Sequence, residues 1–300
     1  MKALCCLCLL AVPSLGPAQE AQVAAIAAFT EGPAVDEHGN VYFTETTFAR
    51  ILKWSPSGAL TVFRENSNGA NGLLIDAQQR LIACEAGKQH PPRVTRTDLR
   101  TGKIEVLADN YRGQRFSAPN DVTIDGKGRI YFTDLPGGTV YRIDPDRKLT
   151  RLLERPAIER PNGISISPDD KTLYLVEANP AEGGARMIRA YDLLEDGSVR
   201  NMRVFHNFYP GRSADGLCID TEGNLYAAAG LHRRRGTSET LDTKPGIHVF
   251  RPSGQLWKFY PIPEDTITNC AFGGPDRKTL YVTAGKTLFR IANDIAGTPR

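Results

Sequence analysis

The chain has 300 residues, a formal net charge of +3, and charged residues of both signs without a long basic run. This pattern argues against nucleic acid as a partner and favours a small-molecule ligand. No stretch after the first 18 residues is long and apolar enough to cross a bilayer, which takes about 20 residues, so no membrane span is expected.

The first 18 residues have the composition of a secretory signal peptide. Lys2 precedes an apolar run from Ala3 to Leu15, and small residues follow at Gly16 and Ala18. We expect residues 1–18 to be removed and the mature protein, residues 19–300, to be exported to the periplasm or secreted.

Three of the six cysteines lie inside this signal peptide, which leaves Cys84, Cys218 and Cys270. An odd number at long spacing is not a disulfide framework, so buried free thiols are expected. Cys218 and Cys270 follow equivalent positions of neighbouring repeats, so a bridge between them stays open. The sequence alone does not place their Cβ atoms at bonding distance.

The rest of the chain is built from six copies of a repeat. Each copy has a polar residue, an apolar strand-like run, a turn, and a second strand that is often aromatic, as in Asn120–Asp134 (NDVTIDGKGRIYFTD). The copies begin at Glu31, Asn71, Asn120, Asn162, Asp215 and Asn269. Successive starts lie 40 to 54 residues apart, a period typical of β-propeller blades.

Two further β-patterned segments follow each such pair, as in Thr139–Glu154. The predicted fold is therefore all-β, one domain forming a six-bladed β-propeller with four antiparallel strands per blade. The last copy is one strand short after Lys286–Ala292, and an apolar segment, Gln22–Phe29, precedes the first copy. We expect this N-terminal strand to complete the last blade and close the ring, which removes open sheet edges.

The first residue of every copy carries a side-chain oxygen, and all six should face the propeller axis at one level. Asn and Asp before Gly are also common turn formers, which is the alternative interpretation. Two observations favour a functional ring. The turn after the first strand has its own residues, such as Gly39 and Gly128, and Glu31 has no comparable turn preference.

Such a ring suits a hard divalent cation, and Ca²⁺ accepts about six to eight oxygen ligands. Glu31 and Asp215 would balance the charge of one cation, Ca²⁺ being favoured over Zn²⁺, Mg²⁺ or Mn²⁺. The five histidines show no zinc-binding spacing. The chain also has no Gly-x-Ser-x-Gly elbow, P-loop or dinucleotide fingerprint.

The motifs together resemble the SMP-30/gluconolactonase/LRE-like family over essentially the whole mature sequence. They are EGP at Glu31, APNDV at Ala118–Val122, RPNGI at Arg160–Ile164, ADGL at Ala214–Leu217, and TNCAFGGPDRKTLYVT at Thr268–Thr283. The resemblance implies a six-bladed propeller that holds one divalent cation, usually calcium, on its axis. It also implies hydrolysis of sugar lactones, as in several members.

Carried over residue by residue, the resemblance assigns metal ligands to Glu31, Asn162 and Asp215. Asn120 matches a residue that contacts metal or substrate, Asp215 matches the proposed general base, and Asn71 is assigned with Asn120 to substrate binding. Asn71 and Asn269 line the channel in this interpretation.

Three departures from the family pattern leave the substrate open. Ala86 stands where many members have His, LPGG follows YFTD at Leu135–Gly138, and Leu231–Gly246 is a charged insertion. The connections from the second to the third strand of each blade should surround the mouth that holds the ring. Arg233, Arg234 and Arg235 are candidates for binding an anionic substrate group, although a charge run is more often solvated.

The function expected from these residues is hydrolysis of a sugar lactone, with the cation polarising the carbonyl and Asp215 accepting a proton from water. A bound cation weakens a carboxylate base, so water activated by the cation is the alternative nucleophile. Hydrolysis of another ester or phosphotriester is a rival function, as is a non-catalytic propeller that binds a sugar or protein around a structural calcium. The oligomeric state is not predicted.

Overall fold

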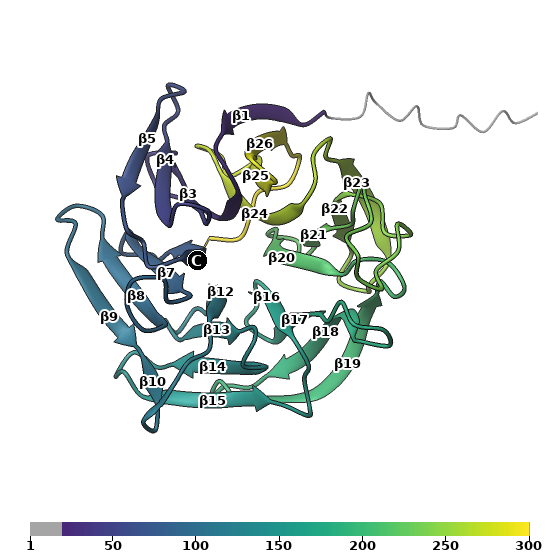
Figure 1. Cartoon of the computed structure of the whole chain (residues 1–300), viewed down its shortest axis with the longest axis horizontal. Helices are drawn as coiled ribbons and strands as arrows, with labels where there is room; N and C mark the ends of the chain where they lie inside the picture. The colour runs from purple at the N-terminus through teal and green to yellow at the C-terminus, as the bar shows by residue number, and fades with distance from the viewer. Residues whose placement is uncertain (1–19, 300) are drawn as a thin grey trace, which may run out of the picture.

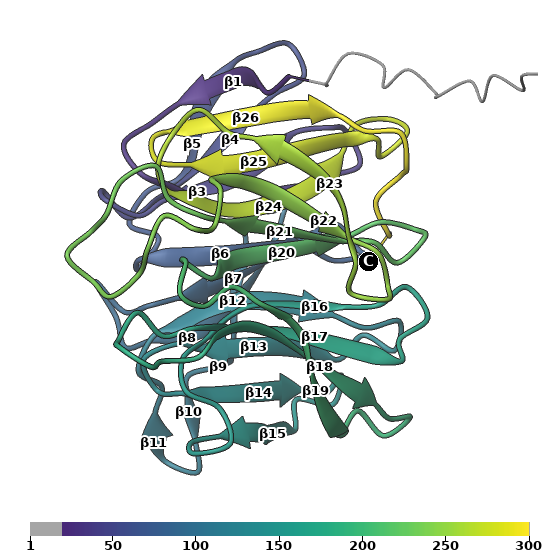
Figure 2. The same cartoon turned by 90° about the vertical axis from the view of Figure 1, so that its right-hand side faces the viewer.

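The computed structural model describes residues 20–299, so the predicted signal peptide, residues 1–18, lies outside the described residues. Within the described part, six four-stranded antiparallel sheets surround a central axis as the blades of a propeller (Figure 1). Seen from the side, β12 to β15 lie in order from the axis to the rim (Figure 2). The predicted six-bladed all-β fold is confirmed.

The strands run from the axis outward in each of the first five blades. Blades 1 and 2 comprise β2 (Thr30–Val35), β3 (Val41–Glu45), β4 (Arg50–Trp54), β5 (Leu60–Arg64), and β6 (Ala70–Ile75), β7 (Arg80–Glu85), β8 (Arg93–Asp98), β9 (Ile104–Ala108). Blades 3 and 4 comprise β12 (Pro119–Ile124), β13 (Ile130–Asp134), β14 (Thr139–Ile143), β15 (Leu149–Glu154), and β16 (Pro161–Ile166), β17 (Thr172–Ala178), β18 (Arg186–Leu193), β19 (Val199–Asn207). Blade 5 comprises β20 (Ala214–Ile219), β21 (Leu225–Ala229), β22 (Gly246–Phe250) and β23 (Leu256–Pro261).

Blade 6 is assembled from both ends of the chain. It comprises β24 (Ile267–Gly273), β25 (Thr279–Ala284), β26 (Thr287–Ala292) and, on its outer edge, β1 (Gln22–Ile26). β1 pairs antiparallel with β26, so the predicted closure of the last blade by the N-terminal strand is confirmed. A short hairpin of β10 (Asn110–Tyr111) and β11 (Gln114–Arg115), which the repeat does not predict, lies between blades 2 and 3.

Apolar side chains pack between neighbouring blades. Tyr226 and Val249 of blade 5, for example, are buried with Phe272 and Phe289 of blade 6. The outermost strands are more polar and exposed, as the exposure of Leu60 at 39% illustrates. The described residues contain no helix that is long and apolar enough to cross a membrane. Since the blades cannot bury these faces alone, ring closure is what completes the core.

Candidate active site

The six predicted ring residues occupy the same place in the fold. Each lies near the start of the innermost strand of its blade, opposite the end of the second strand, as the pairing of Pro161 with Glu177 shows for blade 4. In all six blades the register between these two strands shifts at or beside the ring position. Such β-bulges redirect side chains, and here they do so at the channel mouth.

The glycines that follow the ring residues serve close packing rather than turns. A Cβ on Gly163 would lie 2.3 Å from the carbonyl oxygen of Asp215, and one on Gly216 would lie 2.0 Å from the Asn269 side chain. The inner strands therefore converge too tightly at this level for a larger residue. The Asn-Gly and Asp-Gly pairs lie within strands, which removes the turn-former interpretation of the ring.

The turns themselves lie at the other end of the inner strands. In the turn after β2, the Asp36 carboxylate accepts hydrogen bonds from the backbone N–H groups of His38 and Asn40, at 3.0 and 2.8 Å. The same pattern recurs at Asp76, Asp125 and Asp220. In blades 1, 3 and 5 a glycine stands three residues after this Asp, at Gly39, Gly128 and Gly223.

Asp215 is held by two short hydrogen bonds. Its Oδ1 accepts from Asn162 Nδ2 at 2.6 Å, and its Oδ2 accepts from Arg212 Nη2 at 2.6 Å. Arg212 also donates to the backbone carbonyl of Ile267, which fixes its guanidinium beside the ring. Burial raises the pKa of Asp215, and the charge of Arg212 acts in the opposite direction.

Glu31 lies in the same electrostatic environment. It is 7% exposed, and burial followed by the charges of Asp215 and Asp121 raises its pKa well above the usual value. These carboxylates therefore repel one another across the axis, with Arg212 as a nearby positive charge. A divalent cation among them would offset this repulsion, because opposite charge favours the ionised carboxylates.

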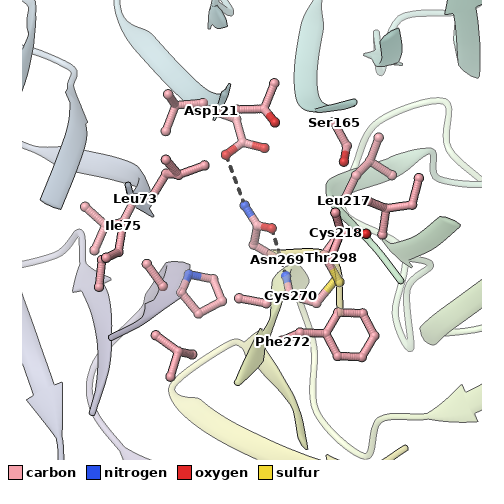
Figure 3. Close-up of a pocket in the computed structure, with 18 of the residues that line it drawn as sticks. Leu73, Ile75, Asp121, Ser165, Leu217, Cys218, Asn269, Cys270, Phe272 and Thr298 are labelled. Atoms are coloured by element: carbon pink, nitrogen blue, oxygen red, sulfur yellow. Dashed lines mark hydrogen bonds between the residues drawn. The ribbon is translucent and has the colours of Figure 1, made fainter. Parts of the chain in front are cut away.

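Asp121 is a buried carboxylate beside the ring that the repeat does not predict. Its side chain accepts hydrogen bonds from Asn269 Nδ2 at 3.4 Å and from the backbone N–H of Ile164 at 3.3 Å (Figure 3). Burial raises its pKa to about 7. The sequence does mark Asp121 in one way: it is an acidic residue at the repeat position that holds glycine in four other copies, Gly32, Gly72, Gly163 and Gly216.

The remaining ring residues differ in their surroundings. Asn71 and Asn120 are partly exposed at the ring position of blades 2 and 3. Asn269 is buried, and its Oδ1 accepts a hydrogen bond from the N–H of Cys270 while its Nδ2 donates to Asp121. Asn269 is therefore held within the channel, whereas Asn71 and Asn120 have exposed surface at the mouth.

A cavity of about 150 Å³ lies along the channel, and Asp121 and Asn269 are part of its lining (Figure 3). Apolar residues such as Leu73 and Phe272 form much of its lining. The segment after β26 crosses toward the axis (Figure 1), where Thr298 donates from its N–H and Oγ1 to the carbonyls of Ile219 and Asp220. Glu31, Asn162 and Asp215 do not line this cavity, so the site belongs to the opposite mouth.

The start of the blade 5 insertion, Leu231–Gly246, is held by Asp265. The backbone N–H groups of His232 and Arg233 donate to Asp265 Oδ2 at 3.2 and 3.1 Å. Burial and the neighbouring charge of Arg212 lower the pKa of Arg235, which places the two guanidinium groups within electrostatic reach of each other. The positive charge of Arg235 also opposes the rise in the pKa of Asp215, and its guanidinium lies 3.8 Å from Asp265 Oδ1.

The donor set fits a hard cation. Among residues 20–299, no three His, Cys, Asp or Glu side chains form a metal-binding group by themselves. The oxygens of Asn120 and Asn162 would complete a site with Glu31 and Asp215. Carboxylate and amide oxygens are the ligands that Ca²⁺ prefers.

A family model and similar named proteins agree on the family of this chain. A family model described as SMP-30/Gluconolactonase/LRE-like region matches residues 29–286. The gluconolactonase of Zymomonas mobilis is 27% identical over 306 residues, covering 90% of this chain and 80% of that protein. The solved structure of a gluconolactonase from Xanthomonas campestris is 30% identical with a TM-score of 0.76, covering 90% of this chain and 88% of that one. The calcium-binding protein regucalcin from Agrobacterium tumefaciens shares the fold at 19% identity and a TM-score of 0.74, over 94% of this chain and 96% of that one.

Proposed function

Because the chain belongs to the SMP-30/gluconolactonase/LRE-like family, we propose that it hydrolyses a sugar lactone at the mouth formed by the six inner strands. The observation that carries the proposal is the group of three carboxylates beside ring asparagines, with Glu31 and Asp121 buried and Asp215 partly buried. Relatives named gluconolactonase and lactonase support the substrate class.

We assign a divalent cation, with Ca²⁺ favoured, to Glu31, Asn120, Asn162 and Asp215. A cation bound there would act as a Lewis acid toward the lactone carbonyl. The hydrogen bond from Asn162 to Asp215 uses the amide nitrogen, so the amide oxygen remains the natural ligand. Removing the repulsion between Glu31 and Asp215 is the electrostatic reason for binding at this place.

Asp215 is assigned as the general base that takes a proton from the attacking water. Its two hydrogen bonds fix the orientation of the carboxylate and leave one lone pair on each oxygen. Asn120 and Asn71, which are partly exposed at the ring position, are assigned to orient the sugar. Arg212 holds Asp215 in place, and its positive charge opposes the rise in the pKa of Asp215 that burial causes.

A substrate panel tests the reaction class. The purified protein, supplied with calcium, should release protons from five- and six-carbon aldonolactones faster than from an aryl ester or a phosphotriester. Turnover confined to the aryl ester or phosphotriester would overturn the lactone assignment, while the proposed location of the active site would still stand. Calcium binding without turnover of any substrate would instead favour the non-catalytic propeller.

A further inference from the structure

We infer that Cys218 and Cys270 form a disulfide that joins blades 5 and 6 beside the channel. The two residues lie on β20 and β24, which are neighbouring innermost strands of different blades. Both line the channel cavity, where their side chains face each other (Figure 3). This modification is independent of the proposed lactonase activity.

The distance between the sulfurs carries the inference. Cys218 Sγ and Cys270 Sγ are 3.1 Å apart, so bond formation at about 2.05 Å needs a movement of only about 1 Å. The Cys270 backbone is fixed by its N–H bond to Asn269 Oδ1 at 2.8 Å. Its thiol lies 3.7 Å from the carbonyl of Tyr226, which holds the sulfur on the side facing blade 5.

Cys84 provides the contrast within the same chain. It is buried in blade 2, and its thiol lies 3.6 Å from the carbonyl of Asp121. The chain region described by the structure therefore contains one facing pair of thiols and one separate thiol. A matched control for every cysteine substitution is thus available at Cys84.

The bond would form by exchange with a disulfide donor, such as oxidised glutathione or a thiol oxidoreductase. One thiolate of the pair attacks the donor disulfide and releases the first donor thiol, and the second thiolate then displaces the other. The pair loses two electrons, the donor gains them, and the two protons leave with the two donor thiols. Burial raises the pKa of Cys218, so we expect exchange during folding, before the channel closes. The export predicted from residues 1–18 would bring the chain into contact with such donors.

The bridge would constrain the junction between blades 5 and 6. Blade 6 combines both chain ends, and apart from the chain connection from β23 to β24 its contacts with blade 5 are noncovalent packing. Cys218 and Cys270 are 52 residues apart, so the bond closes a long loop and reduces the freedom of the unfolded chain. It would also tie the strand of Asp215 to the strand of Asn269.

Mass spectrometry tests the inference directly. Protein refolded with oxidised glutathione should be denatured, alkylated without reduction, and digested. We expect a linked peptide pair containing Cys218 and Cys270, with Cys84 alkylated, and an intact mass lower than that of the reduced protein by two hydrogen atoms. The linked peptides should disappear in Cys218→Ser and remain in Cys84→Ser. Alkylation of both Cys218 and Cys270 after this oxidation would overturn the inference.

Thermal melting gives a second readout, whose main comparison uses the wild-type protein alone. Oxidised wild-type protein should melt at a higher temperature than the same protein kept in a thiol reductant. The difference should persist in Cys84→Ser and vanish in Cys270→Ser. Equal melting temperatures for the linked and reduced wild-type protein would contradict the constraint assigned to the bridge.

Discussion

Glu31 and its repeat equivalents place one polar residue of each blade at the same level of the channel. Glu31 alone has a longer acidic side chain at the ring position, and it is buried near two other carboxylates. If it binds the cation, Glu31→Gln should weaken calcium binding by at least about tenfold, because it removes one negative ligand from the site. Isothermal titration calorimetry measures this change. Glu37→Gln, at an exposed carboxylate in the turn after β2, should bind calcium as the wild type does.

The elevated pKa of Asp121 predicts how pH affects the metal-free protein. Its folded pKa of about 7 lies above the ordinary value near 3.9, so protonated Asp121 favours the folded state. That contribution is fully present below about pH 4 and is lost as pH rises through about 7. A cation favours the ionised carboxylates, so calcium should raise the melting temperature more at pH 8 than at pH 5.

Asp121→Asn provides the control for this pH dependence. In the metal-free variant, the loss of melting temperature between pH 5 and pH 8 should be smaller than in the wild type. The same loss in both proteins would show that Asp121 does not titrate as its burial implies. Calcium stabilisation that is equal at both pH values would count against a cation among these carboxylates.

The ring positions could be predicted residue by residue, but their pairings could not. The repeat identified all six residues because they share one place in a periodic pattern. The contacts of Asp215 with Asn162 and Arg212 depend on how far the inner strands converge, which local sequence does not encode. Asp121 was missed because its repeat position holds glycine in most blades, so it does not stand out as a polar position.

At the scale of elements, Arg186 shows how the loops around the mouth are fixed. It begins β18, its side chain is fully buried, and it donates to the backbone carbonyls of Asn179, Ala181 and Pro210 at 3.0, 2.8 and 2.7 Å. Its guanidinium also contacts Ser238 of the blade 5 insertion. One side chain thus links the connections of two blades.

Replacement of Arg186 by Met should lower the free energy of unfolding by at least about 3 kcal/mol, because several buried carbonyls lose their donor. Chemical denaturation of the two proteins measures the difference. Arg203→Met removes an exposed ion pair with Asp192 and should leave the free energy of unfolding nearly unchanged. Similar costs for the two variants would mean that the Arg186 network does not stabilise these loops.

The strands were largely predictable from sequence, but the hydrogen bonds of Arg186 to distant loops were not. Apolar alternation and turn residues mark each strand locally. A buried arginine whose partners are carbonyls of distant loops has no local signature, because the carbonyls belong to every residue alike. The small β10–β11 hairpin was likewise missed, since it falls outside the repeat.

At the scale of the whole molecule, the ring depends on the N-terminal strand. Ala25 is 9% exposed and packs with Phe43 and Leu288, whereas Val23 on the same strand is 59% exposed. Ala25→Asp should lower the free energy of unfolding by about 3 kcal/mol, because it places an unpaired charge at the closing seam. Val23→Asp should change it by no more than about 0.5 kcal/mol. Denaturant titration distinguishes the two, and equal effects would contradict closure by β1.

Closure itself was predictable because the repeat count left one strand missing at one end and one extra strand at the other. The packing of the last residues against Ile219 and Asp220 was not, since the sequence after β26 carries no strand pattern. Periodic information therefore gives the architecture, and contacts between distant segments complete it.

Proton release from an aldonolactone tests most directly whether the protein hydrolyses a lactone in a metal-dependent reaction that uses Asp215. The assay compares the wild-type protein, the chelator-treated protein, the calcium-restored protein and Asp215→Asn. We predict that the chelator abolishes turnover, that calcium restores it, and that Asp215→Asn lowers kcat by roughly 100- to 10,000-fold. Turnover that survives both chelation and Asp215→Asn would contradict the claim.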